Sequence, residues 1–280
     1  YIDRVKYEFG VIDSMGYQDY FLIVGDIVKW SKDNGINVGP GRGSAAGSII
    51  SFLLGITTVD PIANGLLFER FLNPERISMP DIDIDFEDTR RDEVVQYIQT
   101  TYGKDHVAQI ITYQTLRAKM SIKDIARVLE IPASKANDIT KVISDKDEDL
   151  AEAYAKNKKF KLLVDSDEEV KTIFDSAMLI EGLPRQYSTH AAGIVLSKEK
   201  ITEFVPVQSS YGGYNQTQYS MNDLEVNGLL KIDILGLRNL SFINHTLKLI
   251  GKEIDLGSLD LKDPKVYKLL AAGKTGGIFQ

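Results

Sequence analysis

The segment Met79-Pro80-Asp81-Ile82-Asp83-Ile84-Asp85-Phe86 alternates acidic and apolar residues with a period of two. This alternation is typical of a β-strand, because successive side chains of a strand point to opposite faces. The carboxylates would share one face, about 6 to 7 Å apart, while the apolar side chains fill the core behind them. Such a row of like charges is stable only if cations lie among the carboxylates, and hard oxygen ligands favour Mg²⁺.

Two other roles for these acids need to be weighed. A calcium-binding EF-hand loop is excluded, because it requires Gly after the third acidic position, where this sequence has Phe86. One or more of the acids could instead cap the helix that follows, and this alternative suits Asp85 better than Asp81 or Asp83.

The second motif is the glycine-rich run 39–48, Gly-Pro-Gly-Arg-Gly-Ser-Ala-Ala-Gly-Ser. It lies between an expected short strand at 36–38 and an expected helix at 45–54. Glycines let the backbone approach phosphate oxygens, unpaired N–H groups at a helix start bind anions, Ser44 adds a hydroxyl and Arg42 adds a cation. The run therefore predicts a phosphate-binding turn.

Other interpretations of the glycine run stay open. It is not a Walker A loop, because the lysine and the spacing of that motif are both missing. Gly41, Gly43 and Gly47 overlap a relaxed dinucleotide-binding fingerprint, and Asp60 lies near the distance at which a ribose-binding acid would occur. A tight turn with close helix packing is the remaining alternative.

The third motif is the segment 228–236, Gly-Leu-Leu-Lys-Ile-Asp-Ile-Leu-Gly. Its alternation places Lys231 and Asp233 on one face of a strand and apolar residues on the other. Lys231 and Asp233 could also be ordinary solvent-exposed residues of a strand without a binding role. A carboxylate from a second strand, together with the acids of the first strand and a phosphate-binding turn, is nevertheless the constellation that two-metal phosphoryl transfer requires.

The chain has 280 residues, which predicts about two domains. Residues 115–183 show only helical periodicity, between segments of strand texture at 107–112 and 193–196. We therefore expect a helical subdomain inserted into an α/β unit. Residues 113–142 hold six basic and three acidic side chains, a local charge of +3, which suits either a nucleic-acid-binding face or an ordinary solvated helix surface.

Composition excludes several classes of protein. The formal net charge is −7 and the pI about 5.1, and this acidic balance lowers the expectation of nucleic-acid binding. The absence of cysteine excludes disulfides, thiolate zinc sites, iron–sulfur clusters and a cysteine nucleophile, and it fits a reducing cytoplasm. No run approaches the roughly 20 apolar residues of a membrane span. The start at Tyr1 and the end inside a strand-like segment suggest a piece of a longer protein.

Four segments together resemble the palm motifs of the bacterial DNA polymerase III α-subunit family, the C-family replicative polymerases. They are the glycine-rich run, the segment Leu-Leu-Phe-Glu-Arg-Phe-Leu-Asn-Pro-Glu-Arg at 66–76, the acidic segment 79–86 and Lys-Ile-Asp-Ile-Leu-Gly-Leu at 231–237. Their order and spacing agree with the family over nearly the whole chain. The unbroken run before the acidic segment is similar to the DnaE type, because the PolC type carries a cysteine-rich insertion there.

The resemblance implies an α/β (α+β) fold, in which a polymerase-beta-like nucleotidyltransferase palm carries an inserted all-helical thumb. The palm would comprise residues 1–112 and 191–240, and the thumb residues 113–190. Residues 241–280 would begin the fingers.

The resemblance also implies template-directed DNA synthesis in the cytoplasm, with transfer of a nucleotide from a dNTP to a primer 3′-hydroxyl. Asp81, Asp83 and Asp233 would be the catalytic carboxylates that bind two Mg²⁺ ions, with Asp85 in a supporting role. The nucleotide-binding residues would be Arg42, Gly43, Ser44, Arg70 and Lys231, and the DNA-binding residues Arg117, Lys119, Lys123 and Arg127. Expected partners are primer–template DNA, a sliding clamp and other replisome subunits, the last two through regions outside this chain.

Two other functions remain as alternatives. The chain by itself could be a DNA-binding module without polymerase activity, because most of the fingers lie outside it. An NADP-type oxidoreductase would be based on Gly41 and Gly43, but the three-acid strand argues against it.

Overall fold

The computed structural model divides the chain into two compact units. The first unit comprises residues 1–110 and 190–280, and the second comprises residues 111–189. The residues that the structure describes are 1–75, 80–144, 147, 149–210, 212–252, 254, 256–260 and 262–279. Arg76 and Met79, which belong to the quoted motifs, lie outside the described residues.

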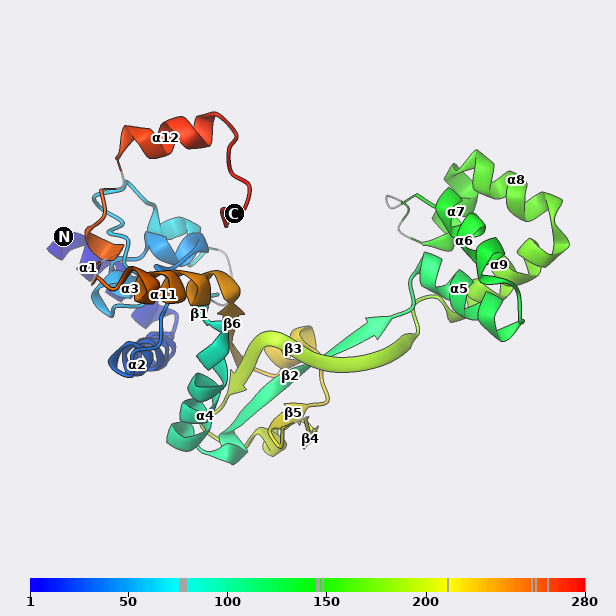
Figure 1. The fold of residues 1–280 in the computed structure, drawn as a ribbon. Coiled ribbons are helices and arrows are strands. Elements are labelled where there is room, and N and C mark those ends of the chain that lie inside the picture. The colour runs from blue at the N-terminus through cyan, green and yellow to red at the C-terminus, as the bar shows by residue number, and fades with distance from the viewer. Residues whose placement is uncertain are drawn as a thin grey trace. The chain divides into compact units, whose positions relative to one another are not determined.

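One mixed sheet of six strands is found within the described residues, in the order β1-β6-β3-β2-β5-β4 (Figure 1). The strands are β1 (Asp83–Glu87), β2 (Val107–Thr115), β3 (Pro184–Leu196), β4 (Val207–Ser209), β5 (Asn215–Thr217) and β6 (Leu230–Leu237). Strands β1 and β6 are parallel, and their register places Asp83 beside Asp233. Strand β3 runs antiparallel to β6 and places Gly193 beside Asp233 on the other side.

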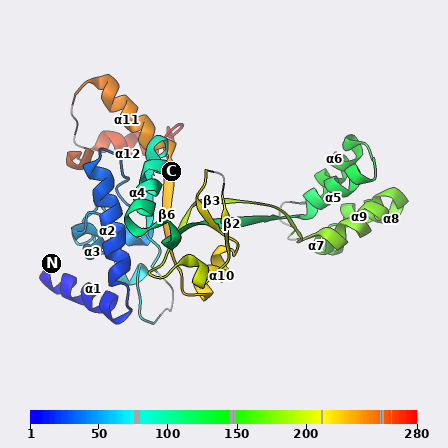
Figure 2. The ribbon, with the colours of Figure 1, turned by 90° about the horizontal axis from the view of Figure 1, so that it is seen from below.

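Helices α2 and α4 cover one face of the sheet near β1 and β6 (Figure 2). The helices of this unit are α1 (Ile2–Ser14), α2 (Gln18–Asp33), α3 (Ile49–Leu53), α4 (Arg91–Tyr102), α10 (Met221–Val226), α11 (Arg238–Ile250) and α12 (Pro264–Ala271). Ile84 of β1 and Ile232 of β6 join the buried cluster that these helices complete. Because side chains alternate along a strand, Asp83 and Asp233 project from the opposite face. The apolar half of the acidic segment thus fixes the direction of its charges.

In the second unit, the chain between the end of β2 and the start of β3 is helical. Its helices are α5 (Ala118–Val128), α6 (Ala133–Val142), α7 (Leu150–Lys156), α8 (Lys158–Ser166) and α9 (Glu168–Ile180). They share a separate core that includes Ile122, Phe160 and Ile173. Asn157 and Asp167 cap α8 and α9 by accepting hydrogen bonds from the first backbone N–H groups. The predicted mixed α/β fold with a helical insertion is confirmed.

The local predictions are partly wrong. The expected strand at 36–38 is a single bridge between Val38 and Phe86, and the expected helix at 45–54 is divided at Ser48 into the 3-10 helix η1 (Gly43–Gly47) and α3. Short strands β4 and β5 were not predicted, because three-residue strands carry too little periodicity. In the described part of the chain, no helix has both the length and the apolar character that a bilayer crossing requires.

Gly193→Ala is expected to lower the free energy of unfolding by about 1 to 3 kcal/mol, because the new Cβ overpacks the sheet. That Cβ would lie 2.8 Å from Ile110 Cδ1 and 2.9 Å from His190 Nδ1. Gly10→Ala in α1 is the control. Beyond its own helix backbone, no heavy atom of the described residues lies within 4 Å of its Cβ position, and a gain of about 0.5 to 1 kcal/mol is expected there.

Urea unfolding followed by the fluorescence of Trp30, the single tryptophan of the chain, measures both changes, because this side chain packs against the core of the first unit. An unfolding midpoint for Gly193→Ala equal to that of the wild type would contradict the prediction.

Candidate active site

Three carboxylates meet at the exposed face of the β1–β6 pair. Asp81 lies just before β1, Asp83 is on β1 and Asp233 is on β6. One carboxylate oxygen from each of the three lies within 4.8 Å of the others. Their side chains range from 61% exposed for Asp81 through 28% for Asp83 to 9% for Asp233, so the cluster opens to solvent on one side.

Two basic side chains reduce the repulsion among these acids. Lys231 Nζ lies 2.7 Å from Asp233 Oδ2 and 3.5 Å from Asp81 Oδ1. Burial alone would lower the pKa of Lys231, but the hydrogen bond and charge of Asp233, with the charge of Asp81, raise it above its ordinary value. The lysine is therefore held as a cation between two of the three carboxylates.

Arg42 of the glycine run binds the third acid. Its Nη1 lies 3.1 Å from Asp83 Oδ2, and its Nε donates to both oxygens of Asp85 at 3.1 Å. Asp85 is therefore not a member of the three-carboxylate cluster but an anchor for Arg42. Burial raises the pKa of Asp83, and the charges of Asp81 and Asp233 add to this effect; Arg42 and Lys231 oppose it without cancelling it.

The cluster fits a hard divalent cation. Asp233 Oδ1 is buried and has no hydrogen-bond partner within the described part of the chain, so one lone-pair donor is left over for a ligand. The oxygen donors of the three carboxylates are the type that Mg²⁺ prefers. Four acids with Asp85 included face two basic side chains, which leaves a formal charge of −2 for a bound cation to neutralise.

A second part of the site is a cavity of about 490 Å³ beside the glycine run. It is lined by Gly43, Ser44, Gly47, Gly65, Leu66, Leu67 and Arg70. The structure thus brings together three of the residues predicted to bind nucleotide, and the neighbouring Arg42 connects their loop to Asp83. Gly43 has a φ of 67°, in the left-handed region that favours glycine.

The geometry of the glycine run does not support dinucleotide binding. A dinucleotide-binding turn requires a strand that leads into the glycines and a helix that leaves them. Here the run follows only the isolated bridge at Val38 and continues into the short η1.

One support of the acidic segment leaves no pattern in the sequence. Tyr20 on α2 is buried, and its hydroxyl oxygen accepts a hydrogen bond of 3.1 Å from the N–H of Ile82. Burial raises the pKa of Tyr20 far above its ordinary value, so the phenol is neutral. Tyr20 thereby fixes the backbone between Asp81 and Asp83 although it lies about 60 residues earlier.

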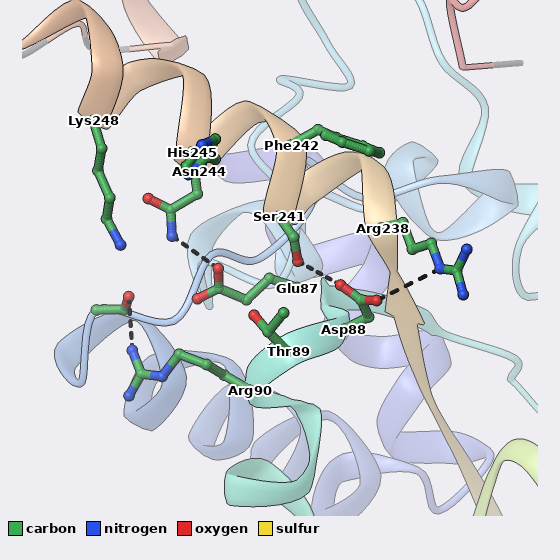
Figure 3. Close-up of a pocket in the computed structure, with 11 residues that line it drawn as sticks. Glu87, Asp88, Thr89, Arg90, Arg238, Ser241, Phe242, Asn244, His245 and Lys248 are labelled. Atoms are coloured by element: carbon green, nitrogen blue, oxygen red, sulfur yellow. Dashed lines mark hydrogen bonds and ion pairs between the residues drawn. The ribbon is translucent and has the colours of Figure 1, made fainter.

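A further cavity, of about 530 Å³, lies between α11 and the end of β1 (Figure 3). Most of the polar side chains that line this cavity already form hydrogen bonds or ion pairs within the protein. Asn244 donates to the Glu87 carboxylate at 2.8 Å, Ser241 donates to Asp88, and Arg90 donates to the Gly35 carbonyl oxygen at 3.1 Å. The bonds from Asn244 and Ser241 attach α11 to the end of β1 and to the turn that follows it, so this cavity lies beside a helix anchor.

The predicted DNA-binding residues lie on or beside α5 in the second unit. Lys119, Lys123 and Arg127 recur every four residues and so follow one row of the helix, whereas Arg117 is the residue before its first turn. The adjoining row, with Ala118 and Ile122, faces the helical core. Arg127 also pairs with Asp124 at 3.7 Å.

Comparisons with known proteins agree on one family. Residues 1–236 match the model of the bacterial DNA polymerase III alpha NTPase domain, and residues 239–280 match that of the finger domain of the same subunit. The whole chain is 50% identical to DNA polymerase III subunit alpha of Bacillus subtilis, 46% to that of Thermus aquaticus and 44% to that of Aquifex aeolicus. It covers 26%, 23% and 26% of those proteins, or about a quarter of their length.

Lys231→Met is expected to lower the free energy of unfolding by about 1 to 3 kcal/mol, because it leaves the buried Asp233 carboxylate beside Asp81 without its cation. Millimolar Mg²⁺ should restore part of the loss. Lys200→Met removes only an exposed pair with Asp105 and is the control, with an expected change below about 0.5 kcal/mol. Urea unfolding with and without Mg²⁺ measures both variants; equal losses, or no effect of Mg²⁺, would contradict the prediction.

Proposed function

The chain belongs to the bacterial DNA polymerase III alpha family, and from this premise we propose that it provides the palm and thumb of a replicative DNA polymerase. The palm would comprise residues 1–112 and 191–240, the thumb residues 113–190, and the fingers would begin at 241. The reaction would be template-directed transfer of a nucleotide from a dNTP to a primer 3′-hydroxyl.

The observation that carries this proposal is the meeting of Asp81, Asp83 and Asp233 on one face of the β1–β6 pair. These carboxylates would hold two Mg²⁺ ions. Bound there, the ions would supply Lewis-acid stabilisation of the triphosphate charge and a lower pKa for the primer hydroxyl. Lys231 and Arg42 would keep the carboxylates oriented, and both would add positive charge beside the triphosphate.

The cavity with Gly43, Ser44 and Arg70 supports a binding position for the triphosphate. Ser44 would donate its hydroxyl to a phosphate oxygen, and Arg70 would add a positive charge. In the transfer, the primer 3′-oxygen forms a bond to the α-phosphorus and the bond from that phosphorus to the bridging oxygen breaks. Pyrophosphate leaves with the electron pair, and the hydroxyl proton is released.

The basic row of α5 supports a role for the second unit in holding duplex DNA. Lys119, Lys123 and Arg127 would contact backbone phosphates, with Arg117 beside them, and such contacts bind without sequence preference. A sliding clamp, other replisome subunits and a cytoplasmic location belong to the same proposal. Regions outside this chain would bind those subunits.

A DNA-binding module without polymerase activity is the second candidate, and the same basic row favours it. The two candidates differ in one result. Binding of primed duplex by the 280-residue chain, with no nucleotide addition even in a polypeptide of the relatives' full length, would favour the module.

Asp83→Asn and Asp233→Asn are expected to reduce primer extension by about 10² to 10³-fold, because each removes a charge that stabilises the transition state. The assay uses the chain extended to the full length of its relatives. Mn²⁺ binding to the 280-residue chain, measured by calorimetry, should weaken in parallel. Asp105→Asn removes an exposed acid outside the cluster and should leave both readouts unchanged. Extension near the wild-type rate in either cluster variant would refute the assignment.

Lys123→Ala is expected to weaken binding of duplex DNA and to reduce the slope of log K against log salt concentration by about 0.9, the value for one lost phosphate contact. Lys141→Ala on α6 removes the same charge from an exposed pair with Asp138 and serves as the control. Fluorescence anisotropy at several salt concentrations measures the slope. An equal decrease for both variants would show that α5 makes no particular contact.

A further inference from the structure

An ion pair on α1, Arg4 with the buried Glu8, lies next to the cavity beside the glycine run. Glu8 is fully buried, and its Oε1 accepts from Arg4 Nε at 2.6 Å. Its Oε2 accepts from Ser48 Oγ at 2.8 Å and from the Ile50 N–H at 3.3 Å. A buried carboxylate is stable only when charge and hydrogen bonds replace its lost hydration, and this one has both.

The guanidinium of Arg4 joins the two walls of the cavity. Its Nη2 donates to the carbonyl oxygen of Gly47 at 3.0 Å and to that of Leu66 at 3.2 Å. Gly47 ends the wall that carries Ser44, and Leu66 belongs to the wall that precedes Arg70. One nitrogen therefore bridges the segments that bear the hydroxyl and the cation of the proposed phosphate site.

Helix α1 also holds the turn that carries Arg70. Tyr7 donates to Glu69 Oε1 at 3.0 Å, and its ring packs edge-on against Phe68 with 6.0 Å between centroids. At the junction of the walls, a Cβ on Gly47 would lie 2.6 Å from the Leu67 carbonyl oxygen. The walls are thus already in contact at this junction, and Arg4 ties the two walls together at the same place.

We propose that Arg4 and Glu8 are positioning residues that set the width of the cavity for a nucleoside triphosphate. Neither residue lines the cavity, so both act through Ser44 and Arg70. This inference rests on the proposed function of the cavity. The inference predicts that loss of the hydrogen bonds from Arg4 to Gly47 and Leu66 weakens triphosphate binding, whereas metal binding at the carboxylate cluster is unchanged.

Arg4→Lys is the sharpest variant, because a lysine keeps the positive charge but has a single nitrogen. That nitrogen cannot reproduce both the bond from Nε to Glu8 and the bonds from Nη2 to the two carbonyl oxygens. Glu8→Gln removes the charge that orients Arg4. Both should raise the dNTP dissociation constant of the chain about tenfold, whereas Mn²⁺ affinity stays at the wild-type value. Lys29→Ala, which breaks an exposed ion pair at the same spacing on α2, is the control and should change neither value.

A polypeptide of the relatives' full length supplies the second readout. There the dNTP KM should rise about tenfold in Arg4→Lys with kcat nearly constant, a split that general destabilisation would not produce. For Arg4→Ala, methylguanidinium should restore part of the affinity by refilling the guanidinium position. If Glu8→Gln does not fold, Arg4→Lys decides the question.

The outcomes separate the two proposals. If the wild-type chain binds no dNTP, or if Ser44→Ala and Arg70→Ala bind as tightly as the wild type, the proposed function of the cavity is wrong. If those two variants lose affinity while Arg4→Lys and a folded Glu8→Gln keep it, the cavity binds nucleotide and only the inference about α1 is overturned.

Discussion

The parallel pairing of β1 with β6 places Asp83 directly beside Asp233, and the rest of the candidate site depends on this register. A slip of β1 by one residue would turn Asp83 toward the core and expose Ile84, because side chains alternate along the strand. The apolar faces of both strands therefore hold the acids together despite their repulsion. Hydrophobic burial behind the sheet stabilises a charge arrangement that would separate on its own.

That repulsion explains why basic residues surround the cluster. Lys231 comes from the strand that carries Asp233, so the same register that creates the repulsion also supplies a cation on the same face. Arg42 comes from the glycine run, and its pair with Asp85 orients it toward Asp83. Acids and bases are thus placed by one sheet and one loop. The remaining negative charge is what makes this face suitable for divalent cations rather than for an isolated ion pair.

The sequence predicts the parts of this site that leave a local pattern. Period-two alternation identified the faces of Asp83 and Asp233, and the glycine run pointed to Ser44. Contacts between distant residues leave no such pattern. Glu8 reads as an ordinary helix-surface residue, and only the fold shows that it is buried against Ser48. Tyr20 likewise gives no sign that it holds the backbone at Ile82.

The net charge of −7 illustrates why composition is a weak guide to what such a chain binds. Charges act over distances of about 8 to 10 Å in physiological salt, so a partner senses local groups rather than the total. Around Asp83 the local charge is negative and the carboxylate oxygens lie close together, which suits small cations. Along α5 the excess is positive and repeats every four residues, which suits a row of phosphates. The net charge of the whole chain therefore argues against neither of the proposed ligands, because each unit has its own core and its own local charges.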